Sequence, residues 1–132
     1  MTSGQARALE ELWPRYGVEY SPAPLPLDAL FGRRAPRTLE IGFGNGEHLA
    51  SLATAHPERD YFGIEVHRPG VGHLMLRCEA ERLPLADGSV DFVTTFNAVH
   101  HFDLELFTEE VARVLRPGGD LFIYTRTPEL NA

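Results

Sequence analysis

The stretch TLEIGFGNG, residues 38–46, decides the fold of this 132-residue chain. Three apolar side chains in this stretch favour a strand: Leu39, Ile41 and Phe43. Three glycines alternate with these residues and beyond them, and glycine is disfavoured inside a packed strand: Gly42, Gly44 and Gly46. The next residues, EHLASLA at 47–53, place Leu49, Leu52 and Ala53 on one helical face. The sequence therefore predicts a strand, a tight glycine loop and a helix, which together form the first half of a βαβ unit.

A second apolar segment completes that unit. Residues 60–66, DYFGIEV, predict a short strand that carries Glu65 near its end. Glu65 follows the glycine loop at close to the ~20-residue interval at which an acid after the second strand binds the ribose hydroxyls of a nucleotide. A glycine turn needed only for packing the helix on the strand is the alternative, and the spaced acid argues against it.

The glycine spacing indicates the kind of ligand. Dinucleotide-binding loops have the pattern G-x-G-x-x-G and hold a diphosphate at the helix N-terminus, whereas this loop is G-x-G-x-G. Glu40 and Glu47 flank it and would repel a diphosphate, so NAD fits poorly and a cationic ligand fits better. The pattern resembles the cofactor loop of class I S-adenosylmethionine-dependent methyltransferases. This resemblance implies S-adenosylmethionine as the cofactor. The residues that it implies for binding are Glu40, Gly42, Gly44, Gly46 and Glu65.

The composition excludes several other function classes. Net charge is −7, with 19 acidic residues against 12 arginines and no lysine, so no broad basic face for nucleic acid is expected. Cys78 is the only cysteine, which excludes an internal disulfide and disfavours a metal site. No apolar run reaches membrane-spanning length and no leader peptide is evident. We therefore expect a cytoplasmic protein without a membrane or metal partner.

The first half of the chain resembles a narrower family. The segments RALEELWPRYGVEY, SPAPLPL, LDALFGR, LEIGFGNG and FGIEVHRPGVG are similar to the bacterial tRNA (guanine-N7) methyltransferases, over about residues 4–76. In that family the glutamates that match Glu40 and Glu65 contact the cofactor. We expect residues 1–37 to form an N-terminal helix and a proline-rich lead-in, and residues 38–132 to form the S-adenosylmethionine-binding domain, within one compact domain overall.

The second half resembles a different group. From residue 77 on, CEAERLPLADGSVDFVTTFNAVHHF and EEVARVLRPGGDLFIYTR look like the broad methyltransferase class that includes the ubiquinone-biosynthesis C-methyltransferases. The residue pattern independently predicts a buried strand at 90–96, an amphipathic helix at 104–115 that ends at the Pro-Gly-Gly of 117–119, and a strand at 121–124. The side chains expected to face the core from that helix are Leu106, Phe107, Val111, Val114 and Leu115.

Two stretches depart from the families that they resemble. The guanine-N7 enzymes carry a Phe-Pro-Asp-Pro-Trp run that handles the tRNA base, whereas this chain has FNAVHH at residues 96–101. Asn97 is then the better candidate for touching cofactor or substrate, and His100 and His101 are expected to be structural rather than a general base. Glu79 stands where the wider family has an aspartate near adenine, so it either binds the cofactor or is a solvated acid.

The segment that follows the second predicted strand has two alternative secondary structures. A parallel crossover needs at least ~10–12 residues, and too few separate residue 66 from a third strand near Leu74. Either residues 74–78 form a strand reached by a loop, or residues 69–82 form one helix. The helical spacing of Val71, Leu74, Met75 and Cys78 favours the helix.

The expected fold class is α/β, a doubly wound and mostly parallel Rossmann-like methyltransferase sheet. It is truncated relative to both families, with four or five strands, because the sequence lacks their C-terminal strand pair. The fifth strand of the family pattern, residues 121–124, would then be an exposed edge. Such an edge is expected to pair two copies into a homodimer.

The sequence predicts an enzyme without identifying its catalytic residues. Methyl transfer from a sulfonium is an in-line displacement in which the protein mainly aligns donor and acceptor, so no dedicated acid or base is required. We expect an S-adenosylmethionine-dependent methyltransferase whose acceptor, a small molecule or a tRNA, is open. The alternatives are a tRNA (guanine-N7) methyltransferase, and a truncated or chimeric remnant that binds the cofactor without activity.

Overall fold

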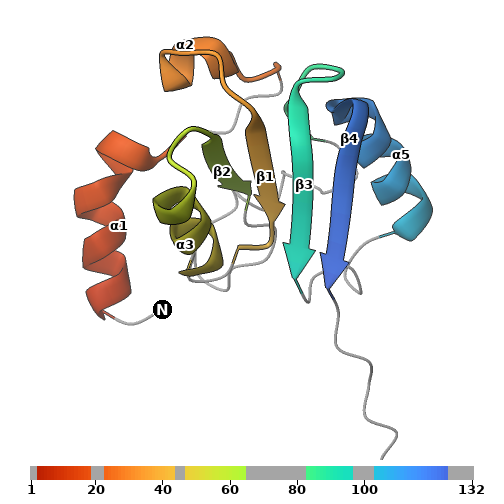
Figure 1. Cartoon of the computed structure of the whole chain (residues 1–132). Coiled ribbons are helices and arrows are strands. Elements are labelled where there is room, and N and C mark those ends of the chain that lie inside the picture. The colour runs from red at the N-terminus through yellow and green to blue at the C-terminus, as the bar shows by residue number, and fades with distance from the viewer. Residues whose placement is uncertain (1–2, 19–22, 44–46, 65–82, 97–102, 125–132) are drawn as a thin grey trace, which may run out of the picture.

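The structure is a computed structural model that describes residues 3–18, 23–43, 47–64, 83–96 and 103–124 (Figure 1). Its helices are α1 (Ser3–Tyr16), α2 (Leu27–Phe31), α3 (Glu47–Ala55) and α5 (Leu104–Val114). Its strands are β1 (Arg37–Ile41), β2 (Asp60–Ile64), β3 (Val90–Phe96) and β4 (Leu115–Tyr124). The glycine stretch thus lies between β1 and α3, as the sequence predicts.

The four strands form one parallel sheet in the order β2-β1-β3-β4. From β1 the chain moves outward to β2, and it later returns to the other side of β1 for β3 and β4. The strand order therefore reverses between β1 and β3. This sheet with its flanking helices confirms the predicted doubly wound α/β fold, with four strands among the described residues.

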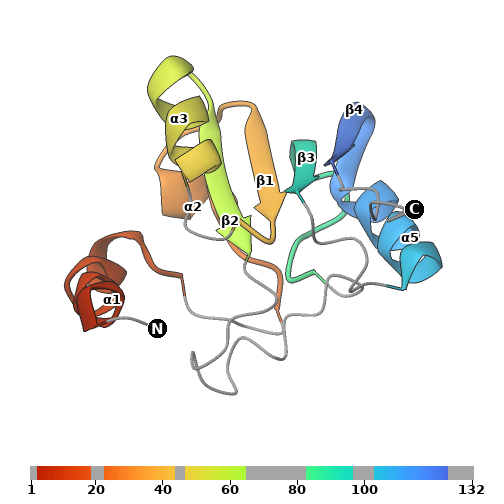
Figure 2. The ribbon, with the colours of Figure 1, turned by 90° about the horizontal axis from the view of Figure 1, so that it is seen from below.

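The two faces of the sheet are covered differently. Figure 2 shows α3 and α5 on opposite sides of it. Alternation along β1 sends Leu39 and Ile41 to the α5 side and Glu40 to the α3 side, where it meets His48 of α3. Buried apolar residues form one core cluster, to which α5 contributes three: Leu27, Leu39, Ile41, Leu83, Leu85, Val90, Val93, Phe107, Val111 and Val114. Full burial of one such side chain contributes about 1.5–3 kcal/mol.

Arg113 of α5 fastens the segment that leads into β3. Its guanidinium donates to the carbonyl oxygens of Leu83 and Leu85 at 3.1 and 2.7 Å, and it pairs with Asp87 at 2.8 Å and Glu110 at 2.5 Å. Glu110 also accepts the amide of Leu83 at 2.8 Å. The hydrogen bond to Glu110 raises the pKa of Arg113 further, so the guanidinium stays charged. These contacts fix the start of β3 against α5.

A second polar cluster holds the amino-terminal end of the sheet. Asp60, buried at the start of β2, pairs with Arg33 at 2.8 Å, and Arg37 of β1 pairs with Asp28 of α2 at 2.6 Å. The hydrogen bond from Arg37 lowers the pKa of Asp28 below its ordinary value. The N-cap position of α2 belongs to Pro26, and Asp28 lies inside the first turn.

The second half of the chain differs from its prediction in detail. Phe107, Val111 and Val114 are buried as expected, whereas Leu106 is 51% exposed because it points away from the sheet. The Pro-Gly-Gly run lies within β4 rather than ending α5, since β4 begins directly at Leu115. Pairing shifts there from Val90↔Leu115 to Phe92↔Asp120, so residues 116–119 form a bulge in the ladder.

Helix α1 includes Pro14 and ends at Tyr16, because a proline so near the end removes only one hydrogen bond of the helix. The choice between a helix at 69–82 and a strand at 74–78 lies outside the described residues.

Candidate cofactor-binding site

The carboxyl ends of β1 and β3 meet where the strand order reverses, which is where open α/β sheets bind ligands. Gly42 follows β1 directly and has φ of +74°, a backbone conformation that side-chain-bearing residues rarely adopt. Its N–H donates to the carbonyl of Ile64, the last residue of β2, at 2.7 Å. The start of the glycine loop is therefore tied across the ends of two strands.

Glu40 is the buried acid of this edge. It is 2% exposed, although a carboxylate is costly to bury unless it is paired. Its Oε1 lies 2.7 Å from Nδ1 of His48, the second residue of α3. Its Oε2 is buried and has no hydrogen-bond partner among the described residues. One oxygen of the carboxylate is thus fixed and the other is available to a donor.

The sequence interpretation missed two threonines beside this acid. Thr94 pairs in register with Glu40, and Thr95 pairs with Ile41. Both are buried, and their hydroxyls lack a partner within the part of the chain that the structure describes. Two adjacent threonines at the carboxyl end of a mostly apolar strand were the available signal. Thr94 lies on the face of Glu40, so it adds a hydroxyl beside the carboxylate.

The neighbour of Glu40 on its other side is Gly63 of β2. A Cβ built on Gly63 would lie 2.4 Å from the ring of Phe43, so the ring occupies the space above this glycine. Gly63, Glu40 and Thr94 thus form one row across the sheet, with an aromatic ring at one end and a hydroxyl at the other.

The structure describes only part of the predicted site. Glu40 and Gly42 lie at the carboxyl edge as expected, and Glu47 is exposed at the start of α3. The remaining predicted residues lie outside the described ranges: Gly44, Gly46, Glu65, Glu79, Asn97, His100 and His101.

Other kinds of site find little support in the described ranges. No group of three or more histidine, cysteine or acidic residues there could hold a metal ion. No helix described is long and apolar enough to cross a membrane. A hollow lined by residues 25–29 and by Arg37, Ala86 and Ser89 lies at the opposite, amino-terminal end of the strands. Arg37 there is already paired with Asp28 and lies 3.6 Å from Asp60.

Comparison with known proteins decides the family. Residues 39–123, more than half of the chain, match the family described as methyltransferase domain. This chain belongs to that methyltransferase family. The class I S-adenosylmethionine-dependent methyltransferase predicted from the glycine loop is thereby confirmed, and S-adenosylmethionine is the cofactor of the class.

Individual curated relatives are similar to parts of this methyltransferase domain. A tRNA (guanine-N(7)-)-methyltransferase of Alkalilimnicola ehrlichii is 67% identical over 85 residues, which are 63% of this chain and 36% of that protein. One from Leifsonia xyli is 47% identical over 114 residues, 86% of this chain and 48% of that protein. The chain thus spans about a third to a half of the curated relatives that it matches.

A solved structure carries the same fold. The YcgJ protein from Bacillus subtilis superposes with a TM-score of 0.56 at 28% identity, over 73% of this chain and 47% of that one. An antibiotic-resistance methyltransferase, Kmr, superposes with a TM-score of 0.57 at 19% identity, over 89% of this chain and 68% of that one. The methyltransferase sheet is therefore shared well beyond the relatives that are close in sequence.

Proposed function

We propose that the chain binds S-adenosylmethionine at the carboxyl end of β1 and transfers its methyl group to an acceptor. The observation that carries this proposal is Glu40, a buried carboxylate with one oxygen unpartnered among the described residues, beside a glycine turn at the reversal point of the sheet. S-adenosylmethionine carries an ammonium and a sulfonium. A negative group at this point favours such a ligand over a diphosphate.

The proposed binding residues are those that the sequence predicts. Gly42 begins a loop that lets the cofactor approach the backbone, and Gly44 and Gly46 continue it. Glu65 would hold the ribose, and Glu79 and Asn97 would line the remainder of the site. In the reaction, a lone pair of the acceptor attacks the methyl carbon while the bond from carbon to sulfur breaks, leaving S-adenosylhomocysteine. The protein contributes alignment of the two reactants.

A tRNA (guanine-N7) methyltransferase is the second candidate function. The names of the curated relatives favour it. The residues at 96–101 argue against it, because the base-handling run of that family is replaced there by FNAVHH, and the net charge of −7 disfavours nucleic acid. The acceptor of the proposed reaction is therefore left between a small molecule and a tRNA.

A methylation assay decides between these acceptors. We expect no transfer of radiolabelled methyl from S-adenosylmethionine to an unmodified tRNA transcript above background. A transcript made with 7-deazaguanosine, which lacks the N7 atom, is the matched control. Incorporation into the ordinary transcript alone, lost in the Glu40→Gln variant, would make the second candidate the function. A chain that binds S-adenosylmethionine but methylates nothing would be the cofactor-binding remnant.

We also propose that two copies associate through β4. This strand is an edge of the described sheet, and its last three residues are exposed although they are large and apolar: Phe122, Ile123 and Tyr124. An exposed edge with apolar side chains favours pairing with a second identical edge. We expect light scattering at high micromolar concentration to give twice the monomer mass of 14.7 kDa. A monomer mass, together with fast hydrogen exchange over residues 121–124, would contradict the dimer.

A further inference from the structure

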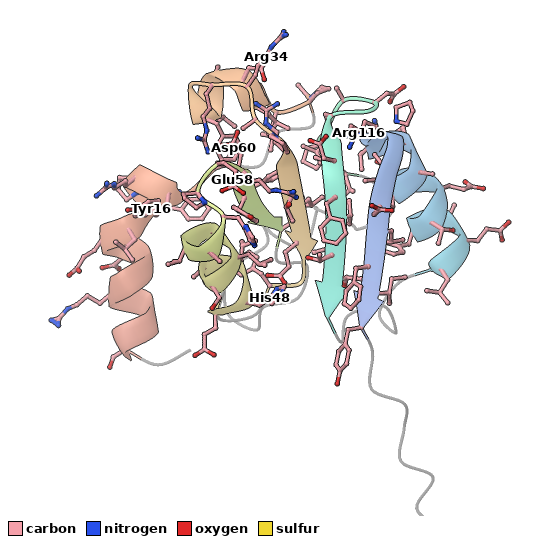
Figure 3. The ribbon with its side chains drawn as sticks, in the orientation of Figure 1. Tyr16, Arg34, His48, Glu58, Asp60 and Arg116 are labelled. Carbon is pink, nitrogen blue, oxygen red and sulfur yellow. The ribbon has the colours of Figure 1, made fainter. Side chains whose placement is uncertain are left out.

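We infer that His48 is a positioning residue for the cofactor, because it holds the Glu40 carboxylate in the orientation that leaves one oxygen for the ligand. The inference rests on the proposed function and assigns a role to a side chain outside the glycine motif. His48 lies near the carboxyl ends of the strands (Figure 3).

The contact joins the two elements on either side of the glycine loop. Glu40 belongs to β1 and His48 to the first turn of α3, with residues 42–46 between those elements. Nδ1 of His48 lies 2.7 Å from Oε1 of Glu40, a short distance for a hydrogen bond between nitrogen and a carboxylate oxygen. An ionised carboxylate only accepts hydrogen bonds, so in the pair that we infer Nδ1 is the donor and Oε1 the acceptor. The pair therefore fixes both the rotamer of Glu40 and the start of α3.

The burial of Glu40 makes its hydrogen bond from His48 important for the orientation of the carboxylate. Glu40 is 2% exposed, so water does not replace a lost partner freely, whereas the His48 side chain is 45% exposed and reaches solvent. A buried carboxylate without this donor would lose the contact that sets its orientation, and a turned carboxylate no longer presents Oε2 to a cationic ligand. With Oε1 held by His48, Oε2 remains available, and it is the atom without a partner among the described residues.

His56 provides a matched control at the other end of α3. It follows the last residue of α3, and its Nδ1 lies 3.4 Å from Oε1 of Glu58. Both side chains of that pair are more than half exposed. An exposed pair of this kind contributes little, and it lies away from the glycine loop. Removing His56 is therefore expected to leave cofactor affinity unchanged.

The test compares four proteins by calorimetric titration with S-adenosylmethionine and with S-adenosylhomocysteine: the wild type, His48→Ala, His48→Asn and His56→Ala. We expect His48→Ala to weaken binding of both ligands about 3- to 10-fold, since a hydrogen bond to a charged group is lost at a half-exposed donor. Asparagine places a side-chain N–H where Nδ1 was, so His48→Asn should recover part of the affinity.

Thermal unfolding of the same proteins separates positioning from helix stability. Loss of the hydrogen bond to the buried carboxylate lowers the stability of His48→Ala, whereas helix propensity favours alanine over asparagine at this position, so the two variants are expected to have similar melting temperatures. Affinity is expected in the order histidine, asparagine, alanine, so the two variants should differ in affinity more than in stability. Affinities that follow the melting temperatures, or that fall equally in His56→Ala, would overturn the role of His48. A wild-type chain that binds neither ligand would overturn the proposed function itself, and this inference with it.

Discussion

Replacing Phe107 by alanine is expected to lower the free energy of unfolding by about 3–5 kcal/mol, a large part of the stability of a domain this small. Phe107 is 0% exposed and packs from α5 into the core beneath β1 and β3. Its removal withdraws an aromatic ring from contact with the core and leaves a cavity that fixed strands cannot close.

Urea unfolding followed by circular dichroism measures this effect. Leu106→Ala is the matched control, because Leu106 is the adjacent residue of the same helix and is 51% exposed. Its loss is expected to cost less than about 1 kcal/mol. Equal costs for the two variants would show that α5 presents a different face to the sheet.

Glu40→Gln is expected to weaken binding of S-adenosylmethionine by about 30-fold or more, because a buried charge that faces a cationic ligand is worth about 2–5 kcal/mol. The fold should not suffer. A buried carboxylate oxygen without a partner is costly, and glutamine has nearly the same shape without the charge. The melting temperature is therefore expected to stay the same or to rise while binding is lost.

One control variant accompanies that measurement. Glu47→Gln is the control, because Glu47 is an exposed acid at the start of α3. It should leave affinity within a few fold of the wild type, since an exposed charge is screened by solvent. A Glu40→Gln protein that binds as tightly as the wild type would show that the buried acid serves the fold alone.

The secondary structure was predictable wherever one pattern of apolar residues and glycines dominated the local sequence. Strand β1, the glycine turn and α3 were predictable because apolar residues give way to glycines and then to a helical period. Strand β3 was predictable for the same reason, as a short apolar run after the turn at residues 87–89. The reversal of strand order that creates the site follows from a parallel sheet in which β2 and β3 flank β1.

Side-chain placement was harder to predict where several solutions satisfy the same pattern. Leu106 continues an apolar period, but only the packing of α5 on the sheet determines which edge of the stripe is exposed. The Pro-Gly-Gly run signals a break in regular structure, and either a helix end or a bulged strand satisfies that signal. Thr94 and Thr95 resemble ordinary strand residues until the register places one of them beside Glu40.

The candidate site was partly predictable for a similar reason. The position of Glu40 before the glycines predicts it as a site residue, and its burial and its bond to His48 follow from the alternation of β1 and the start of α3. No pattern in the sequence pairs His48 with Glu40, since the contact depends on how the helix returns over the strand. Glu65, Glu79 and Asn97 remain predictions from motif spacing and family resemblance.

Calorimetric titration of S-adenosylmethionine into the wild-type chain, with NAD as the competing ligand, tests whether this domain binds S-adenosylmethionine. We expect a saturable isotherm with one site per chain for S-adenosylmethionine and for S-adenosylhomocysteine, and no heat of binding for NAD. Binding of NAD, or no binding of S-adenosylmethionine by a chain that circular dichroism shows to be folded, would contradict that expectation.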